Sequence, residues 1–205
     1  MKILVACEYS GKVREAFRKL GHDAWSCDLL PADDNSPFHI QGDVLPILND
    51  GWDMMVAHPP CTYLTNAGVT WLYKDGERWK DLIDGAVFFR KLWQADIPLK
   101  AIENPIMHKY AKAIIGGTQI QVIQPYHFGH LEQKATTLWL VGLPPLVPTT
   151  NLKVETFALP NKERQRLHWA SPGPDRWKLR SETYQGIADA MASQWSSVLT
   201  VKEQP

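Results

Sequence analysis

The sequence predicts an α/β fold in which a mostly parallel sheet carries helices on both faces. Short apolar segments, typical of strands that are buried on both sides, recur along the chain. Between several of them, apolar residues recur at helical spacing, which predicts crossover helices. Polar residues directly follow several apolar segments, as they do in open α/β sheets that bind ligands at the carboxyl ends of their strands.

Seven strands and three helices are predicted from these patterns. The strands, which are short, apolar and bounded by turn residues, are expected in chain order at residues 3–7, 23–27, 38–40, 53–57, 99–102, 119–123 and 136–141. The helices, whose apolar residues recur three and four apart, are expected at residues 13–20, 78–93 and 184–195. The last two strands are expected at the far edge of the sheet. Prolines between residues 143 and 148 break regular structure, and no strong element is expected again before the terminal helix.

Five polar side chains follow predicted strands and form a candidate site. They are Glu8, Asp28, Asp43, Cys61 and Glu103. Because the carboxyl ends of parallel strands meet along one edge of a sheet, we expect these groups on one rim. An acid at the end of the second strand, such as Asp28, lies where Rossmann-like sites bind ribose hydroxyls.

Cys61 is the most informative of these residues because two prolines precede it. Pro59 and Pro60 fix φ and remove two backbone donors, so the strand must stop there and present the next side chain on a stiff loop. This loop follows a central strand, where open α/β sheets place their ligands. The alternative is a structural cysteine behind a proline turn, since free cysteine is among the most buried residue types.

Composition indicates one compact domain and no global basic footprint. The chain has 205 residues, 44% of them hydrophobic, and 22 basic residues balance 22 acidic ones. Basic residues nevertheless gather among aromatic ones between residues 161 and 180, as Lys162, Arg164, Arg166, Arg176, Lys178 and Arg180. This segment is either a phosphate-binding and base-stacking surface or a solvated face.

The cysteines and apolar runs favour a cytoplasmic protein without metal. Cys7, Cys27 and Cys61 form no Cys-x-x-Cys pair, which argues against a disulfide framework or a zinc site. His127 and His130 have no acidic or cysteine partner at ligand spacing, so we expect no metal there. The first apolar run is too short for a signal sequence, and no run approaches the length that spans a membrane.

In their order along the chain, the motifs resemble those of the DNA (cytosine-5) methyltransferases, in particular compact forms carried by phages. The resemblance rests on Glu8-Tyr9-Ser10-Gly11, Cys27-Asp28 and Gly42-Asp43 for the cofactor motifs, Pro59-Pro60-Cys61 for the catalytic motif and Glu103-Asn104-Pro105 for the Glu-Asn-Val motif. Phe128-Gly129 and residues 132–142 are similar to the Gln-x-Arg-x-Arg motif with its strand, and Gly186-Ile187-Ala188 to the last motif. The Pro-Pro-Cys and Glu-Asn elements are its specific part.

The resemblance implies a Rossmann-like S-adenosylmethionine-dependent methyltransferase fold, with a single catalytic domain over residues 1–205. It implies Cys61 as the nucleophile at carbon 6 of cytosine and Glu103 as the carboxyl group at N3. The cofactor, S-adenosyl-L-methionine, is expected at Glu8, Tyr9, Ser10, Gly11, Asp28, Asp43 and Pro59. DNA, duplex or single-stranded, is expected as the partner, at Pro60, Asn104, Lys134, Thr136, Arg176, Lys178 and Arg180.

Departures from the family bear on the substrate. The Gln-x-Arg-x-Arg positions hold Glu132, Lys134 and Thr136, so a hydroxyl replaces the guanidinium expected at O2 of cytosine. Residues 143–183 form only a reduced substrate-contacting segment in place of a sizeable target-recognition region, so weak sequence discrimination is expected. The cofactor turn has one clear glycine where the family usually has several.

Three alternatives remain open. The first is a transferase acting on free cytosine nucleotides or another pyrimidine, suggested by the short substrate segment. The second is an amino-methyltransferase, whose motif has Asp, Asn or Ser before Pro-Pro, a pattern that His58 and Cys61 fit poorly. The third is a catalytically silent nucleic-acid-binding protein, against which the presence of both Cys61 and Glu103 argues.

Overall fold

Seven strands form one sheet in the computed structural model, which describes residues 1–117, 121–171, 173, 176–181 and 183–198. The strands are β1 (Lys2–Ala6), β2 (Asp23–Asp28), β3 (His39–Gln41), β4 (Met54–Ala57), β5 (Leu99–Pro105), β6 (Gln121–Ile123) and β7 (Thr136–Val141). Their order across the sheet is β3-β2-β1-β4-β5-β7-β6. The first five strands of this order pair in parallel, whereas β7 is antiparallel to both of its neighbours.

This order confirms the predicted Rossmann-like α/β fold and places the site. The chain leaves β1 toward β2 and β3, then returns to build β4 and β5 on the other side. The crevice where the direction reverses, at the carboxyl ends of β1 and β4, is where open α/β sheets bind ligands. As predicted, β6 and β7 occupy the far edge.

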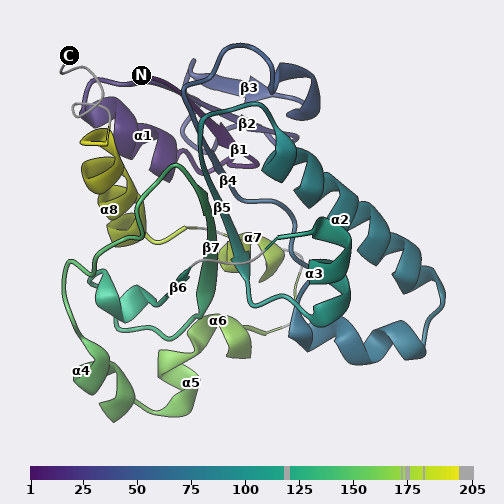
Figure 1. The fold of residues 1–205 in the computed structure, drawn as a ribbon. Helices are drawn as coiled ribbons and strands as arrows, with labels where there is room; N and C mark the ends of the chain where they lie inside the picture. Colours follow the sequence, from purple (N-terminus) through teal and green to yellow (C-terminus); the bar gives the residue numbers. More distant parts are fainter. Residues whose placement is uncertain (118–120, 172, 174–175, 182, 199–205) are drawn as a thin grey trace.

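Helices cover both faces of the sheet, as predicted. Figure 1 shows α1 (Lys12–Lys19) and α8 (Gln185–Ser196) side by side on one face, with α2 (Glu77–Gln94) and α3 (Lys109–Ile115) on the other. Helix α3 was not predicted from the sequence. This helix has only seven residues, and its N-cap is His108, whose Nδ1 accepts from the amide of Ala111 at 3.2 Å, rather than one of the usual capping residues.

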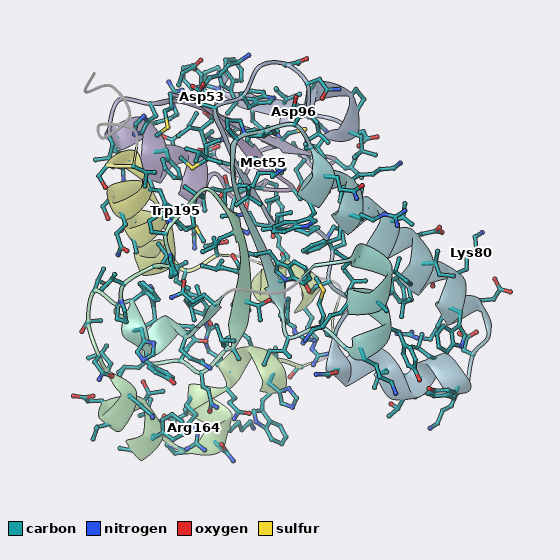
Figure 2. The ribbon with its side chains drawn as sticks, in the orientation of Figure 1. Asp53, Met55, Lys80, Asp96, Arg164 and Trp195 are labelled. Carbon is teal, nitrogen blue, oxygen red and sulfur yellow. The ribbon has the colours of Figure 1, made fainter. Side chains whose placement is uncertain are left out.

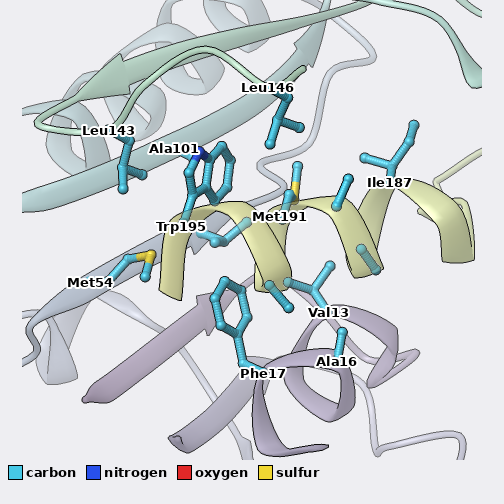
Figure 3. Packing of buried hydrophobic residues seen from close by; sticks show 14 of the residues in the cluster. Val13, Ala16, Phe17, Met54, Ala101, Leu143, Leu146, Ile187, Met191 and Trp195 are labelled. Carbon is cyan, nitrogen blue, oxygen red and sulfur yellow. The ribbon is translucent and has the colours of Figure 1, made fainter. Parts of the chain in front are cut away.

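The face under α1 and α8 holds the first of two hydrophobic clusters. Ile187, Met191 and Trp195 of α8 pack toward Phe17 of α1 and the sheet (Figure 3). Trp195 is fully buried, and its indole nitrogen donates to the carbonyl oxygen of Pro144 at 2.9 Å. Truncating such a side chain to alanine costs about 3–5 kcal/mol, so α8 is a structural part of the domain.

The opposite face is held by aromatic rings. The ring centroids of Phe89 in α2 and Trp139 in β7 lie 5.1 Å apart in an edge-to-face arrangement, and Trp93 lies 5.6 Å from Trp139. Both clusters pack directly against the central strands. The carboxyl ends of those strands are therefore held rigidly, which is what precise placement of a site requires.

Short helices fill the connections. They are the 3₁₀ helices η1 (Leu45–Ile47), η2 (Asn66–Tyr73) and η3 (Pro125–His127), and the α-helices α4 (Lys153–Ala158), α5 (Asn161–Arg164), α6 (Arg166–Trp169) and α7 (Arg176–Ser181). The expectation of no strong element between residues 148 and 184 was therefore wrong in the case of α4 to α7. Helices of four to six residues are too short to show an amphipathic period. Within the proposed substrate segment, residues 172, 174–175 and 182 lie outside the described residues.

Several strand boundaries differ from the predictions, most of all in β5, which continues to Pro105, so that Glu103 lies within this strand rather than after it. β1 ends at Ala6 because Cys7 adopts a left-handed backbone conformation, with φ of 58°, which turns the chain out of the sheet. The expected strand over residues 119–123 is described only from Gln121 onward, since residues 119 and 120 lie outside the described part of the chain. In Figure 2, Asp53 and Asp96, which precede β4 and β5, lie at the opposite end of the molecule from Arg164 of α5.

Candidate active site

A rigid turn carries Cys61 beyond the end of β4. The amide of His58 donates to the carbonyl oxygen of Ala6 at 2.9 Å, which extends the pairing with β1 by one residue. Pro59 and Pro60 have no amide hydrogen to continue it. Pro59 is buried and Pro60 exposed, and the half-buried Cys61 closes a turn by accepting from the amide of Leu64 at 3.0 Å.

Two cations lie near the Cys61 thiol. Burial raises the pKa of Cys61, while the positive charges of Lys134 and Arg180 act in the opposite direction and offset part of the shift. The Lys134 ammonium group also donates to the carbonyl oxygen of Arg180 at 2.9 Å, so these two residues approach the turn together. Lys134 and Arg180 are therefore placed to favour the thiolate.

A histidine and a glutamate form a buried pair next to this turn. In the register of β4 and β5, Ala57 lies opposite Ile102, so the next residues, His58 and Glu103, are neighbours. Nδ1 of His58 lies 3.0 Å from Oε2 of Glu103, and the two side chains are only 10% and 13% exposed. The Thr183 hydroxyl lies 3.5 Å from both atoms. Glu103 was predicted from the sequence as a site residue, whereas His58 and Thr183 were not.

The surroundings of His58 and Glu103 favour opposite charges on the two side chains. Burial disfavours the charged imidazole, yet the hydrogen bond to Glu103 and the charges of Glu103 and Glu8 raise the pKa of His58 above its ordinary value. Burial likewise opposes ionisation of Glu103, but His58, Lys134 and Thr183 hold the pKa of this carboxyl below its usual range. Both shifts favour the charged forms, an imidazolium beside a carboxylate.

Glu8, expected on the open rim, instead caps α1. Its carboxylate accepts from the amides of Val13 at 2.7 Å and Arg14 at 3.2 Å, and the residue is only 4% exposed. The turn before α1 requires Gly11, which has φ of 71°, because a Cβ there would lie 2.3 Å from the Arg14 guanidinium. Burial raises the pKa of Glu8. Its contribution to a cofactor site is therefore to fix the turn over residues 8–11.

Asp28 and Asp43 lie together at the ends of β2 and β3. Each accepts a local backbone bond at 3.0 Å, Asp28 from the amide of Leu30 and Asp43 from that of Leu45. Burial and then the charges of Asp28 and Asp43 raise the pKa of Cys7, which places both carboxylates near the end of β1. Asp28 is half-buried and Asp43 exposed, so both remain accessible from solvent.

The end of β2 suits the ribose of a nucleoside cofactor, because the Asp28 carboxylate there can accept hydrogen bonds from ribose hydroxyls. The space over the turn is small, however. A cavity of about 30 Å³, lined among others by Glu8, Ser10, His58 and Thr183, is close to the volume of one water molecule. Entry of any larger ligand group over this turn therefore requires the covering residues to shift.

The covering residues belong to α7 and the residues after it. The hydroxyl of Tyr9 donates to the carbonyl oxygen of Lys178 at 3.2 Å and lies 3.3 Å from the Ser181 hydroxyl. Lys178 also pairs with Asp33. Of the other predicted DNA contacts in α7, Arg176 donates to the carbonyl oxygen of His168 at 3.2 Å, and Arg180 is exposed.

Two further predicted substrate contacts are turned into the protein. Asn104 is 1% exposed, and among the described residues neither its side-chain oxygen nor its side-chain nitrogen has a hydrogen-bond partner. Thr136 is 2% exposed, and its hydroxyl donates to the carbonyl oxygen of Lys134 at 3.4 Å. Of the three departures from the Gln-x-Arg-x-Arg pattern, Lys134 is therefore the one whose charge reaches Cys61 and Glu103.

A larger cavity adjoins the smaller one at Thr183. Its volume is about 240 Å³, and its lining includes Lys12, Glu132, Arg166 and Tyr184. Glu132 accepts from Arg166 at 2.7 Å and from the Tyr184 hydroxyl at 2.8 Å. Glu132 is thus committed to holding α6 and the residue before α8.

Neither a metal centre nor a spanning helix is found within the described ranges. No group of three or more His, Cys, Asp or Glu side chains in that part of the chain could hold a metal ion. No helix there is long and apolar enough to cross a membrane.

Comparisons with known proteins give similarities to solved structures only. No protein-family model and no curated protein matches the chain. Among solved structures, the chain is similar to a prophage-encoded protein of E. coli whose provisional description is a DNA modification methyltransferase. The TM-score is 0.46 and the sequence identity 14%, over 78% of this chain and 55% of that one. The chain thus spans about half of that protein's length.

Proposed function

We propose that this protein transfers a methyl group from S-adenosylmethionine to carbon 5 of cytosine in DNA, with Cys61 as the nucleophile. The observation that carries the proposal is the convergence of a thiol, a carboxylate and a cation at the ends of neighbouring strands. The charges of Lys134 and Glu103 both act on the Cys61 thiol, so these three groups lie together. The Pro59-Pro60 turn holds the thiol in a fixed position.

These groups match the chemistry that carbon 5 requires. This carbon is a poor nucleophile, and addition of a thiolate at carbon 6 turns it into an enamine carbon. Lys134 and Arg180 favour the thiolate of Cys61. Glu103, on the next strand, would interact with the N3 edge of the ring, where charge develops during the addition.

S-adenosylmethionine would supply the methyl group when bound. Asp28 and Asp43 would hold its nucleoside part, and the turn over residues 8–11 would lie close to its amino-acid end. The contacts of Tyr9 with Lys178 and Ser181 must open for that end to enter.

DNA is the proposed partner because the phosphates of a polymeric substrate would bind the basic side chains around the crevice. Arg180 of α7 lies beside Lys134, whose charge acts on the Cys61 thiol, and Arg176 belongs to the same helix. Phosphate contacts of this kind provide affinity without reading sequence, which suits a chain with a short substrate segment. A base inside a duplex cannot reach a half-buried thiol, so it must be flipped out or already single-stranded.

A second candidate substrate is a pyrimidine that carries hydrogen on N3, such as uracil in a polymer or a free nucleotide. The observation that favours it is the bond from His58, which holds Glu103 ionised. An ionised carboxylate only accepts hydrogen bonds, and uracil offers a donor at N3 where cytosine offers an acceptor.

Nucleoside mass spectrometry tests both candidates. The protein is incubated with S-adenosylmethionine and, in parallel, with duplex DNA, single-stranded DNA, uracil-containing DNA, RNA and free pyrimidine nucleotides, and Cys61→Ser serves as the matched control. Formation of 5-methylcytosine in DNA by the wild type alone supports the proposal. A 5-methyluracil product favours the second candidate, whereas methylation of an exocyclic nitrogen, or no methylated product from any substrate, contradicts the proposal.

A further inference from the structure

We propose that His58 is the proton source for Glu103, so that the pair, rather than the glutamate alone, protonates N3 of cytosine when Cys61 adds to the ring. This inference rests on the proposed function and assigns a role to a residue that none of the sequence motifs includes. His58 does not touch the substrate in this account. It acts through Glu103 and is a positioning residue.

The geometry gives the proton a direct path. Nδ1 of His58 and Oε2 of Glu103 lie 3.0 Å apart, at the ends of adjacent parallel strands whose register fixes their separation. Both side chains are almost fully buried, so water does not compete for this bond. Oε2 is the oxygen that receives the proton, so the Glu103 carboxyl group must rotate to present it to the ring.

The surroundings favour a proton on His58. Glu103 lies on β5 and Glu8 follows β1, and both carboxylates act to keep the imidazole charged. Lys134, which precedes β7, acts in the opposite direction, and the neutral hydroxyl of Thr183 lies 3.5 Å from Nδ1. Two carboxylates therefore favour the charged imidazole and one ammonium group opposes it.

Cytosine needs this proton because its N3 is an acceptor and an ionised carboxylate cannot donate to it. As the Cys61 sulfur bonds to carbon 6, the electron pair of the C5–C6 double bond moves through C4 to N3. The Nδ1 proton of His58 passes to Oε2 of Glu103, and after the carboxyl group rotates, this same O–H gives its proton to N3. A thiolate and an imidazolium become a thioether and a neutral imidazole, so charge and protons balance. The transfers reverse when the thiolate leaves.

The other ring nitrogen of His58 offers a route for reprotonation. Within the described chain, Nε2 of His58 is buried without a hydrogen-bond partner, and the imidazole lines the cavity of about 30 Å³ beside Glu8 and Ser10. This volume is sufficient for one water molecule. A proton can therefore reach Nε2 from the side of Glu8 while Nδ1 stays engaged with Glu103.

Exchange of the carbon 5 hydrogen tests the inference without cofactor. Reversible thiolate addition makes carbon 5 exchange its hydrogen with solvent, so tritium release from DNA that contains [5-³H]cytosine reports the addition step. In the wild type, the rate should rise with pH as Cys61 ionises and fall again as His58 loses its proton. His58→Asn keeps a donor to Glu103 but cannot supply a proton, so it should lose the falling limb and exchange about 100-fold more slowly at neutral pH.

Thr183→Val is the matched control, since it removes the other hydrogen-bond partner of Glu103 without removing a titrating group. This variant should keep the falling limb. An unaltered pH profile in His58→Asn, with exchange in the wild type intact, overturns the inference and leaves the proposed function standing. Absence of exchange in the wild type at every pH contradicts the proposed function itself.

A measurement on the unmodified protein covers the case in which His58→Asn does not fold. Nitrogen NMR of ring-labelled histidine should show His58 protonated at both ring nitrogens at pH 7. A neutral imidazole at that pH overturns the inference.

Discussion

The ammonium group of Lys178 lies 2.7 Å from Oδ1 of Asp33 and ties α7 to the loop that follows β2. Together with the contacts of Tyr9 to α7, this pair holds the helix over the turn where the cofactor is expected. Lys178 was predicted to contact DNA, and in this structure its charge is paired with a carboxylate. Both side chains are more than 40% exposed, so the pair contributes only about 0–1 kcal/mol and can exchange for a phosphate.

The basic residues of α7 should therefore contribute unequally to DNA binding. Arg176→Ala combined with Arg180→Ala should raise the dissociation constant for DNA and flatten its salt dependence by about two units of slope, one for each lost phosphate contact. Lys178→Ala should have a smaller effect, because part of its charge is already neutralised by Asp33. Fluorescence anisotropy over a range of salt concentrations measures both quantities. Unchanged affinity and slope in the double variant would make α7 a solvated surface.

Cofactor binding should depend on Asp28. Asp28→Ala removes the carboxylate at the end of β2 and should weaken S-adenosylmethionine binding about tenfold or more, as expected for loss of a hydrogen bond to a charged group. Asp50→Ala is the control, because Asp50 is an exposed acid that precedes β4, at the other end of the parallel strands. Calorimetry measures the affinity of both variants for S-adenosylmethionine. Equal affinities in the two variants would remove Asp28 from the cofactor site.

Cys61→Ser should abolish methyl transfer and spare the fold. A serine hydroxyl is far less ionised than a thiol at neutral pH and is a much weaker nucleophile. Because burial raises the pKa of Cys61, the wild-type rate should also increase as the pH rises above neutrality, until His58 loses its proton. Initial rates of methyl transfer across pH measure this. Undiminished turnover in the serine variant would indicate direct transfer to an amino nitrogen.

The His58 and Glu103 pair should make stability depend on pH. The raised pKa of His58 gives a contribution that is complete below its ordinary value of 6.5 and is lost as pH rises through the folded-state pKa. The lowered pKa of Glu103 gives a contribution that is present above its ordinary value of 4.5 and is lost as pH falls. His58→Asn should therefore be most destabilising, by about 2 kcal/mol, between pH 4.5 and 6.5.

Chemical denaturation of the wild type and of His58→Asn at a series of pH values measures the difference in their free energies of unfolding. The gap between wild type and variant should narrow above pH 6.5. A gap that stays constant with pH would mean that His58 is neutral in the folded protein.

The strands and long helices could be predicted from sequence because their patterns are local. Apolar runs such as Met54–Ala57 and the amphipathic helix Glu77–Gln94 show their burial directly in residue order. The short helices α4 to α7 could not be predicted, since each is stabilised by contacts with distant segments. An example is the Tyr9 hydroxyl bond to the carbonyl oxygen of Lys178.

The candidate site was predictable only in part, for a similar reason. Cys61 could be predicted because it follows β4 and two prolines, and Glu103 because it lies near the carboxyl end of β5 and precedes an asparagine. His58 also follows a strand, but its role depends on the pairing of β4 with β5, which aligns Ala57 with Ile102 and hence His58 with Glu103. Thr183 comes from a segment some 80 residues away from Glu103 in the chain, and no local pattern indicates their contact.

The most direct test of the account is covalent trapping at Cys61. DNA that contains 5-fluorocytosine is incubated with the protein and S-adenosylmethionine, and the product is digested and mapped by mass spectrometry. Release of the enzyme requires loss of a proton from carbon 5. Fluorine takes the place of that hydrogen and cannot leave as a cation, so the thioether at carbon 6 should persist. The account predicts a stable methylated adduct on Cys61 in the wild type and none in Cys61→Ser. An adduct on Cys7 or Cys27, or methyl transfer to ordinary cytosine without any trapped adduct, would contradict it.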